Sequence, residues 1–196
     1  MIRDPSSYRH LPTRGNPFSR WLGRLGMRIF GGWKIVGELP DISKAIIPVA
    51  PHTSNWDFFV GLAVKFALGV RLSFLGKHSI FVFPVRRLLI WLGGIPVQRD
   101  SAHGIVGQMV EQFGKRNDLL LVLAPEGTRS KVSEWRKGFL HMAQQANIPV
   151  IPIAFCFVTR SILISEPMSV GDDIDAALQR IKDFTNQAVG KRPELQ

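Results

Sequence analysis

The residues with the clearest chemical potential are a histidine and an aspartate five positions apart, His52 and Asp57. They stand at the start and near the end of a mostly polar run that directly follows the apolar residues 45–50. A carboxylate that accepts a proton from one imidazole nitrogen fixes the tautomer, and it stabilises the imidazolium formed when the other nitrogen takes a proton. The pair can therefore act as a general base. Because no obvious serine or cysteine nucleophile accompanies it, we expect direct attack by a substrate hydroxyl.

The spacing decides where these two side chains can meet. Five positions along one helix turn the side chain by about 500°, which leaves the two residues roughly 140° apart. They converge only if His52 lies in a loop and Asp57 in the first turn of a helix. Ser54 or Asn55 would suit the N-cap of that helix, and Asp57 would complement its dipole. A packed, inert loop histidine beside a helix cap is the alternative interpretation of the same residues.

Alternating strand and helix patterns predict the elements that position this pair. Strands are expected at residues 33–36, 45–49, 72–75, 95–97, 119–123, 150–157 and 161–165, and helices at 18–30, 56–68, 84–91, 101–115, 137–146 and 174–189. This alternation predicts an α/β fold with a mostly buried, mixed sheet flanked by helices. The length of 196 residues suits one domain. We expect a polar N-terminal segment at 1–17, the domain at 18–190 and a tail at 191–196.

Polar residues follow two of the expected strands. In open α/β sheets, ligands bind beyond the carboxyl ends of the strands. Glu126, Gly127, Thr128 and Arg129 come after residues 119–123, and Arg99 comes after residues 95–97. Gly127 permits positive φ or a close approach of the backbone to a ligand. An arginine fork suits phosphate, and Glu126 can accept from a substrate hydroxyl or hold an arginine. A strand-to-loop turn with a solvated arginine is the alternative.

The positive net charge of the chain favours an anionic binding partner. The formal net charge of +10 suits nucleic acid, a phospholipid surface or a phosphorylated small molecule. Nucleic acid is not expected, because the chain has neither aromatic-interleaved RNA-binding motifs nor zinc-finger spacing. The single cysteine, Cys156, permits no internal disulfide, and no cluster of metal ligands surrounds it.

Residues 18–30 are typical of a basic amphipathic helix. Its apolar positions are Phe18, Trp21, Leu22, Leu25 and Ile29, and its arginines are Arg20, Arg24 and Arg28. Such a helix can lie in the interface of an anionic membrane, or it can be an ordinary surface helix with its apolar side on the core. Residues 1–16 lack the apolar centre of a signal peptide, and no apolar run reaches the roughly 18 residues of a membrane span. We expect peripheral or monotopic attachment on the cytoplasmic side.

Four segments taken together resemble the glycerolipid acyltransferase family typified by 1-acylglycerol-3-phosphate acyltransferase. The family's histidine, four residues and aspartate match His52 and Asp57, and its Gly-x-Ile-(Phe or Pro)-Ile-x-Arg motif matches residues 93–99. The Pro-Glu-Gly-Thr-Arg-Ser part of its third motif matches residues 125–130, and its apolar, proline-rich fourth motif matches residues 148–153. Pro51 replaces a common asparagine and Ala124 replaces the usual phenylalanine, but neither change removes a reactive group.

The resemblance implies an acyl donor thioester, either acyl-CoA or acyl carrier protein, and a lysolipid acceptor. It implies that His52 is the base, that Asp57 orients it, and that no covalent acyl-enzyme forms. It also implies that the reaction needs no metal and no cofactor besides the acyl donor. It assigns acceptor binding to the five residues Arg99, Glu126, Gly127, Thr128 and Arg129. The acceptor expected first is 1-acylglycerol-3-phosphate, in phospholipid biosynthesis. Open alternatives are another lysolipid or a lipid-linked amine or alcohol as acceptor, a thioesterase or lipid hydrolase, and a non-enzymatic basic membrane-binding protein.

Overall fold

The computed structural model describes residues 4–98, 104–128, 131–132 and 134–196. Seven strands are described, namely β1 (Lys34–Val36), β2 (Lys44–Ala50), β3 (Leu72–Lys77), β4 (Gly94–Val97), β5 (Leu119–Leu123), β6 (Ile153–Cys156) and β7 (Ser161–Ile164). The helices described are α1 (Pro17–Ile29), α2 (Trp56–Leu68), α3 (Val85–Trp91), α4 (Gly104–Lys115), α5 (Gly138–Ala146) and α6 (Ile174–Thr185). Short 3-10 turns lie at Pro5–Ser7 (η1), His78–Ile80 (η2) and Pro193–Leu195 (η3).

The strands form one sheet in the order β1-β7-β6-β2-β5-β3-β4. Every neighbouring pair is parallel except β6 and β7, which are antiparallel. Five strands therefore have their carboxyl ends on the same side of the sheet, namely β2, β3, β4, β5 and β6. The expected α/β fold with a mixed, helix-flanked sheet is confirmed.

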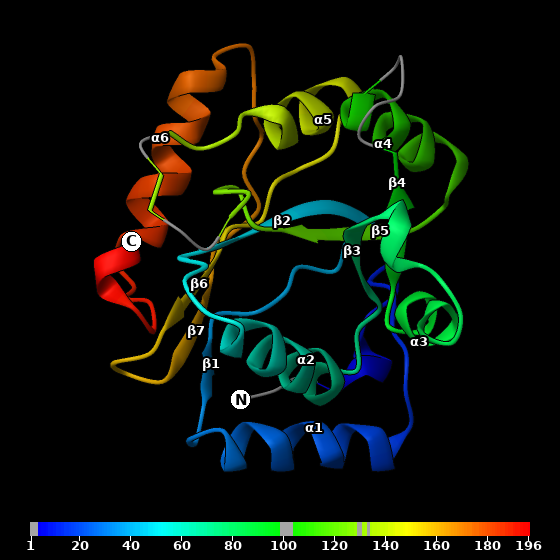
Figure 1. Ribbon diagram of the computed structural model, residues 1–196, viewed down its shortest axis with the longest axis vertical. Coiled ribbons are helices and arrows are strands. Elements are labelled where there is room, and N and C mark those ends of the chain that lie inside the picture. Colours follow the sequence, from blue (N-terminus) through cyan, green and yellow to red (C-terminus); the bar gives the residue numbers. More distant parts are fainter. Residues whose placement is uncertain (1–3, 99–103, 129–130, 133) are drawn as a thin grey trace.

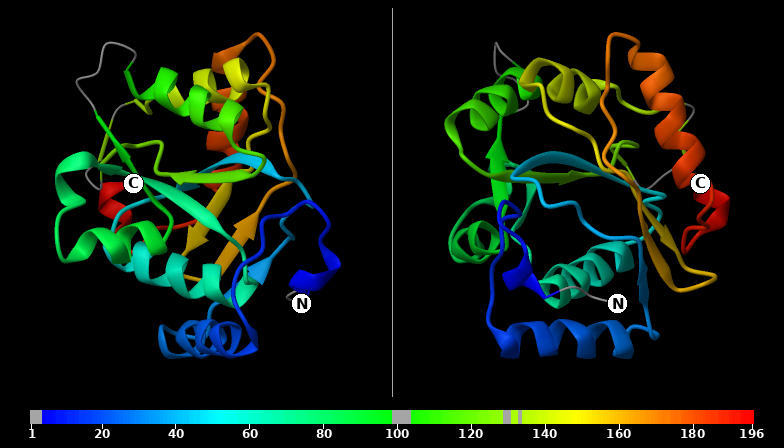
Figure 2. Two further views of the ribbon diagram at one scale, coloured as in Figure 1. Left: turned by 90° about the vertical axis from the view of Figure 1, so that its right-hand side faces the viewer. Right: turned by 180° about the vertical axis from the view of Figure 1, so that it is seen from behind.

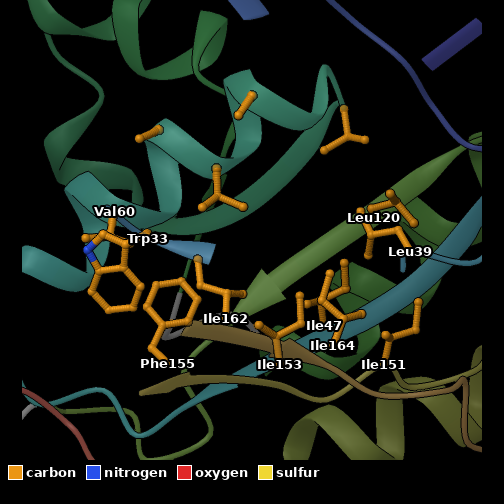
Figure 3. Packing of buried hydrophobic residues seen from close by; sticks show 14 of the residues in the cluster. Trp33, Leu39, Ile47, Val60, Leu120, Ile151, Ile153, Phe155, Ile162 and Ile164 are labelled. Atoms are coloured by element: carbon orange, nitrogen blue, oxygen red, sulfur yellow. The ribbon is translucent and has the colours of Figure 1, made fainter. Parts of the chain in front are cut away.

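Both faces of the central strands are buried. In β2, Ala45 and Ile47 face the side covered by α2, while Ile46 faces the side covered by α4, α5 and α6. Figure 1 shows these helices on opposite sides of the sheet. Figure 3 shows the cluster on the α2 side, where side chains of β2, β5, β6 and β7 face the helix. This two-sided burial explains why β2 and β5 are almost entirely apolar in sequence.

Helix α1 forms an additional layer outside α2, as both views of Figure 2 show. A glycine permits the close contact between them. A Cβ atom added at Gly23 would lie 2.2 Å from Ala67 N and 2.7 Å from Ala63 O. Gly23 and Met27 are the buried residues of α1. The face that α1 turns to the protein is therefore narrow, and a glycine lies where α1 comes closest to α2.

Two expected elements are shorter in the structure. The strand expected at residues 150–157 covers only Ile153–Cys156, because Pro149 and Pro152 have no N–H to donate to a strand ladder. Val150 forms isolated bridges to Ile46 and Met168 instead. The helix expected to reach residue 189 ends at Thr185, and the chain then turns so that Val189 O accepts the backbone N–H of Phe157 at 2.8 Å.

Candidate active site

The junction between β2 and α2 brings His52 and Asp57 together. His52 follows the end of β2 at Ala50, and Asp57 is the second residue of α2. His52 Nδ1 lies 3.0 Å from Asp57 Oδ2, and the two side chains are 20% and 3% exposed. The geometry is the one that the spacing required, with a loop histidine meeting an aspartate in the first helical turn.

Two contacts fix the Asp57 carboxylate. Oδ2 faces His52 Nδ1 and also accepts the backbone N–H of Ser54 at 3.0 Å. Oδ1 is buried and has no hydrogen-bond partner among the described residues. A neutral His52 that donates its Nδ1–H to Asp57 carries its lone pair on Nε2. That nitrogen is the one able to take a proton from a substrate, while the carboxylate stabilises the resulting charge.

Both expected capping residues stand at the start of α2. Asn55 occupies the N-cap position, but its side chain makes no capping hydrogen bond. Ser54 Oγ accepts the backbone N–H of Trp56 at 3.2 Å. Ser54 therefore supports the turn on which Asp57 stands, through both its main chain and its side chain.

Glu126 makes a contact that the sequence did not indicate. Its two carboxylate oxygens accept the backbone N–H of His52 at 3.1 and 2.9 Å. The two residues are brought together because they follow β2 and β5, which are neighbouring parallel strands. Burial raises the pKa of Glu126, and the hydrogen bond from the His52 main chain opposes that effect. Glu126 thus supports the loop that carries the histidine, and a contact with substrate stays a prediction.

Gly127 adopts the positive φ that its sequence position allowed, with a value of 69°. A Cβ atom there would lie 2.9 Å from Arg136 Nε, so the glycine also makes room for this guanidinium. The backbone N–H of Arg136 donates to Pro125 O at 3.0 Å. This main-chain hydrogen bond holds Arg136 at the site, next to the loop that contains Glu126 and Gly127. In the sequence, the signal for it is the pair of cations Arg136 and Lys137 just before α5, where an anion would be favourable.

Of the remaining expected substrate-binding residues, one lies at the site and two lie outside the described residues. Thr128 lines the same cavity as His52. Arg99 and Arg129 lie outside the described residues, so their roles stay predictions. The strand that precedes Arg99, β4, ends at Val97 on the same edge of the sheet as β2 and β5.

A large cavity, about 850 Å³ in volume, opens at the His52–Asp57 pair. Between α2 and the sheet its walls are apolar and come from the cluster in Figure 3, including Ile47, Phe155 and Ile162. Near α4 and α5 its walls include Val106 and Phe139. Its polar lining consists of the residues His52, Asp57, Lys65, Ser73, Lys77, Thr128 and Arg136. The volume lies in the range of small-molecule sites, roughly 300–1,000 Å³.

Lys65 is a second buried ionisable group along this cavity, and no pattern in the sequence indicated its burial. It is 8% exposed, and its Nζ donates to Leu72 O at 3.0 Å and to Leu92 O at 2.5 Å. Burial lowers its pKa to about 8, and the nearby charge of Arg14 adds to the effect. Lys65 thereby ties α2 to the start of β3 and to the turn before β4.

Known proteins resemble this chain in sequence. The family model described as Acyltransferase matches residues 35–156. The 1-acyl-sn-glycerol-3-phosphate acyltransferase of Saccharomyces cerevisiae is 33% identical in an alignment over 129 residues that covers 61% of this chain and 41% of that protein. The protein of the same name from Cocos nucifera is 24% identical over 146 residues, 71% of this chain and 46% of that protein. The chain thus spans less than half the length of these two relatives.

A solved structure is similar in fold. The crystal structure of the 1-acyl-sn-glycerophosphate (LPA) acyltransferase PlsC from Thermotoga maritima matches with a TM-score of 0.62 and 20% identity, over 86% of this chain and 77% of that chain. The resemblance that the sequence motifs indicated is confirmed at the level of family. Because the family model covers more than half of the 196 residues, the chain belongs to the Acyltransferase family.

Proposed function

We propose that the protein transfers a fatty acyl group from a thioester donor, acyl-CoA or acyl carrier protein, to the hydroxyl of a lysophospholipid. The acceptor proposed first is 1-acylglycerol-3-phosphate. The observation that carries this proposal is the His52–Asp57 pair at the lining of a large, mostly apolar cavity. The names of the two relatives support the same acceptor.

The chemistry follows from the orientation of His52. Its Nε2 takes the proton of the acceptor hydroxyl as the hydroxyl oxygen attacks the thioester carbonyl carbon. The new C–O bond forms, the C–S bond breaks, and the departing thiolate takes the proton back from the imidazolium. Asp57 holds the tautomer and stabilises the imidazolium through the 3.0 Å contact between its Oδ2 and His52 Nδ1. No side chain of the protein becomes acylated.

The acceptor's phosphate needs cations near the catalytic pair. Arg136 lines the cavity beside Gly127 and is the described arginine best placed for this role. We assign Arg99, Thr128 and Arg129 to the same site, because they follow strands that end at this edge of the sheet or line the cavity. Arginine forks bind phosphate oxygens in pairs, which also fixes the orientation of the acceptor hydroxyl.

The part of the cavity between α2 and the sheet suits an acyl chain. Its walls are aliphatic and aromatic side chains, among them Ile47, Phe155 and Ile164. Each methylene moved from water into such a wall contributes about 0.8 kcal/mol. A chain that enters this space leaves its thioester at the polar end, where His52 and Asp57 lie.

A membrane surface would supply such an acceptor, and α1 supports attachment to one. Four of its apolar residues do not pack on the core: Phe18, Trp21, Leu22 and Ile29 are 65%, 55%, 46% and 70% exposed. Arginines Arg24 and Arg28 on the same helix are also exposed. Exposed tryptophan and phenylalanine beside arginine suit the interface of an anionic bilayer. We propose peripheral attachment at the cytoplasmic leaflet.

A second exposed apolar set follows β3. It comprises Ile80, Val82, Phe83, Val85, Leu88, Ile90 and Trp91, and Arg86 and Arg87 lie among them. None of the helices in the described part of the chain is long and apolar enough to cross a bilayer. These exposed surfaces support contact with one leaflet.

The test offers purified protein a panel of lysolipid acceptors with labelled acyl-CoA or labelled acyl carrier protein, and separates the product lipids. We expect a diacyl product whose amount depends on the acceptor. Release of free fatty acid at the same rate with and without acceptor would instead identify a thioesterase that uses the same base on water. Membrane binding with no turnover of any donor would identify a non-enzymatic protein.

A further inference from the structure

The segment that follows α6 returns to the loop that carries His52. We call residues 188–196 the return segment. Figure 1 shows it, in red, beside the cyan loop between β2 and α2. It begins at Ala188, which is fully buried, and ends with the turn η3.

The return segment contacts the loop on both sides of the catalytic histidine. The backbone N–H of Arg192 donates to Thr53 Oγ1 at 3.1 Å, and Thr53 is only 2% exposed. A Cβ atom at Gly190 would lie 2.8 Å from Thr53 Oγ1 and 3.2 Å from Pro51 Cγ, so only glycine fits there without displacement. Pro51 and Thr53 are the two neighbours of His52 in the chain.

A third contact lies next to Asp57. Lys191 Nζ lies 4.2 Å from the centre of the Trp56 ring, which is within cation–π range. Trp56 is the first residue of α2, and Asp57 is the second. The return segment therefore contacts residues adjacent to both members of the catalytic pair.

The segment is held in shape by its own hydrogen bonds. Gln196 Nε2 donates to Ala188 O at 2.9 Å, and Gln196 Oε1 accepts the backbone N–H of Gly190 at 3.1 Å. The backbone N–H of Phe157, just beyond β6, donates to Val189 O at 2.8 Å. The two Gln196 bonds fix the shape of the segment, and the Phe157 bond anchors it beside β6, so that it can act as a fixed support.

We propose that the return segment positions the catalytic loop, with Thr53 as its main positioning residue. Glu126 holds the main chain of His52 from the β5 side, and Arg192 holds Thr53 from the opposite end of the chain. Thr53 is not assigned a contact with substrate. The proposal rests on the proposed function only in its kinetic part, because it also concerns the geometry of His52 itself.

The decisive variant is Thr53→Val, which keeps the shape of the side chain and removes the acceptor for the Arg192 N–H. Thr53→Ser keeps that acceptor. Thr185→Val is the matched control, because Thr185 is equally buried at 2% exposure but its Oγ1 donates only to Ile181 O and Lys182 O of its own helix. Lys191→Met, at an exposed position, breaks the contact with Trp56 without risk to the core.

Two readouts are measured for each variant: the kcat and KM of acyl transfer, and the NMR signal of the His52 Nδ1–H proton in 15N-labelled protein. For Thr53→Val we expect kcat to fall about tenfold or more with little change in KM, since small misplacements of reacting groups are costly. We also expect the Nδ1–H signal to shift or broaden. Thr53→Ser and Thr185→Val should keep both readouts, and Lys191→Met should lower kcat less than Thr53→Val does.

The outcomes separate this proposal from the proposed function. An Nδ1–H signal unchanged in Thr53→Val, together with an unchanged kcat, would overturn the positioning role. An equal loss in Thr185→Val would also overturn it, because the effect would then be general destabilisation. If the wild type transfers no acyl group, the proposed function fails, while the NMR signal still decides whether the return segment positions His52.

Discussion

Glu126 and His52 are joined through the main chain: both Glu126 carboxylate oxygens accept the backbone N–H of His52, at 3.1 and 2.9 Å. The histidine is thus held at two points, by Asp57 at its ring and by Glu126 at its backbone. Parallel pairing of β2 with β5 makes this possible, because it places the residues that follow both strands side by side. A base held in this way loses little entropy when the substrate arrives.

Removing the Glu126 carboxylate should therefore slow catalysis without touching the imidazole. We expect Glu126→Ala to lower kcat about 10- to 100-fold, as small misplacements of a catalytic group do. Glu126→Gln should lose less, because its amide oxygen can still accept the His52 N–H. Initial rates at saturating substrates measure both, and Glu134→Ala, an exposed acid in the following loop, is the control. A Glu126→Ala enzyme with wild-type kcat would contradict the supporting role.

The contact between α1 and α2 should depend on the missing side chain of Gly23. Gly23→Ala places a methyl group 2.2 Å from Ala67 N, and we expect a loss of about 1–3 kcal/mol in the free energy of unfolding. Gly114→Ala is the matched control, because it lies in α4 with no heavy atom within 4 Å of its added Cβ. That change should stabilise by roughly 0.5–1 kcal/mol. Urea denaturation that gave both variants the same sign would show that the close approach of the helices is unimportant.

Lys65 should make stability depend on pH in a defined window. Its folded pKa is about 8 against an ordinary value of 10.5, so between these pH values the unfolded chain binds more protons. Its contribution to the free energy of unfolding therefore rises as pH increases through that window, by up to roughly 3 kcal/mol. Lys65→Met removes this contribution. We expect the wild type to gain stability relative to Lys65→Met from about pH 8 to about pH 10.5 in urea titrations. A stability difference that is constant across the window would mean that Lys65 is not titrating as a buried group.

The exposed apolar residues of α1 should control binding to lipid. We expect the double change Phe18→Ser and Trp21→Ser to weaken partition onto phosphatidylcholine vesicles that contain phosphatidylglycerol by at least about tenfold, since each buried side chain contributes about 1.5–3 kcal/mol. Val36→Ser is the control, because Val36 on β1 is 53% exposed and Trp21 is 55% exposed. Binding should also fall with added salt, which screens the arginines. Equal binding by the double variant in a vesicle sedimentation assay would rule α1 out as the attachment site.

Local patterns in the sequence predict much of the fold. The expected bounds of α2 and β5, residues 56–68 and 119–123, agree with the structure. Both elements have sharp chemical boundaries. A polar loop precedes α2 and Gly69, with φ 65°, ends it, while Asp118 directly precedes β5 and Pro125 follows it closely. The meeting of His52 and Asp57 also followed from local spacing, because both belong to one short loop and helix start.

Contacts between distant parts of the chain could not be predicted in this way. Glu126 and His52 are 74 positions apart, and their hydrogen bond depends on the order of strands in the sheet. Lysine is ordinarily exposed, so nothing in the sequence indicated that Lys65 lies among backbone carbonyls. The contact of Arg192 with Thr53 spans 139 positions and arises only because the chain turns back after α6. In each case a side chain or main-chain group is satisfied by a partner that only the tertiary fold brings near.

In the proposed mechanism, His52, oriented by Asp57, is the base for acyl transfer. The most direct test is the initial rate of transfer from labelled acyl-CoA to 1-acylglycerol-3-phosphate by His52→Ala and Asp57→Asn, with folding checked by circular dichroism. His141→Ala, at an exposed position on α5, is the control. We expect both active-site variants to lose about 10²- to 10⁴-fold in kcat while the control keeps the wild-type rate. A His52→Ala enzyme within a fewfold of the wild-type rate would contradict the mechanism.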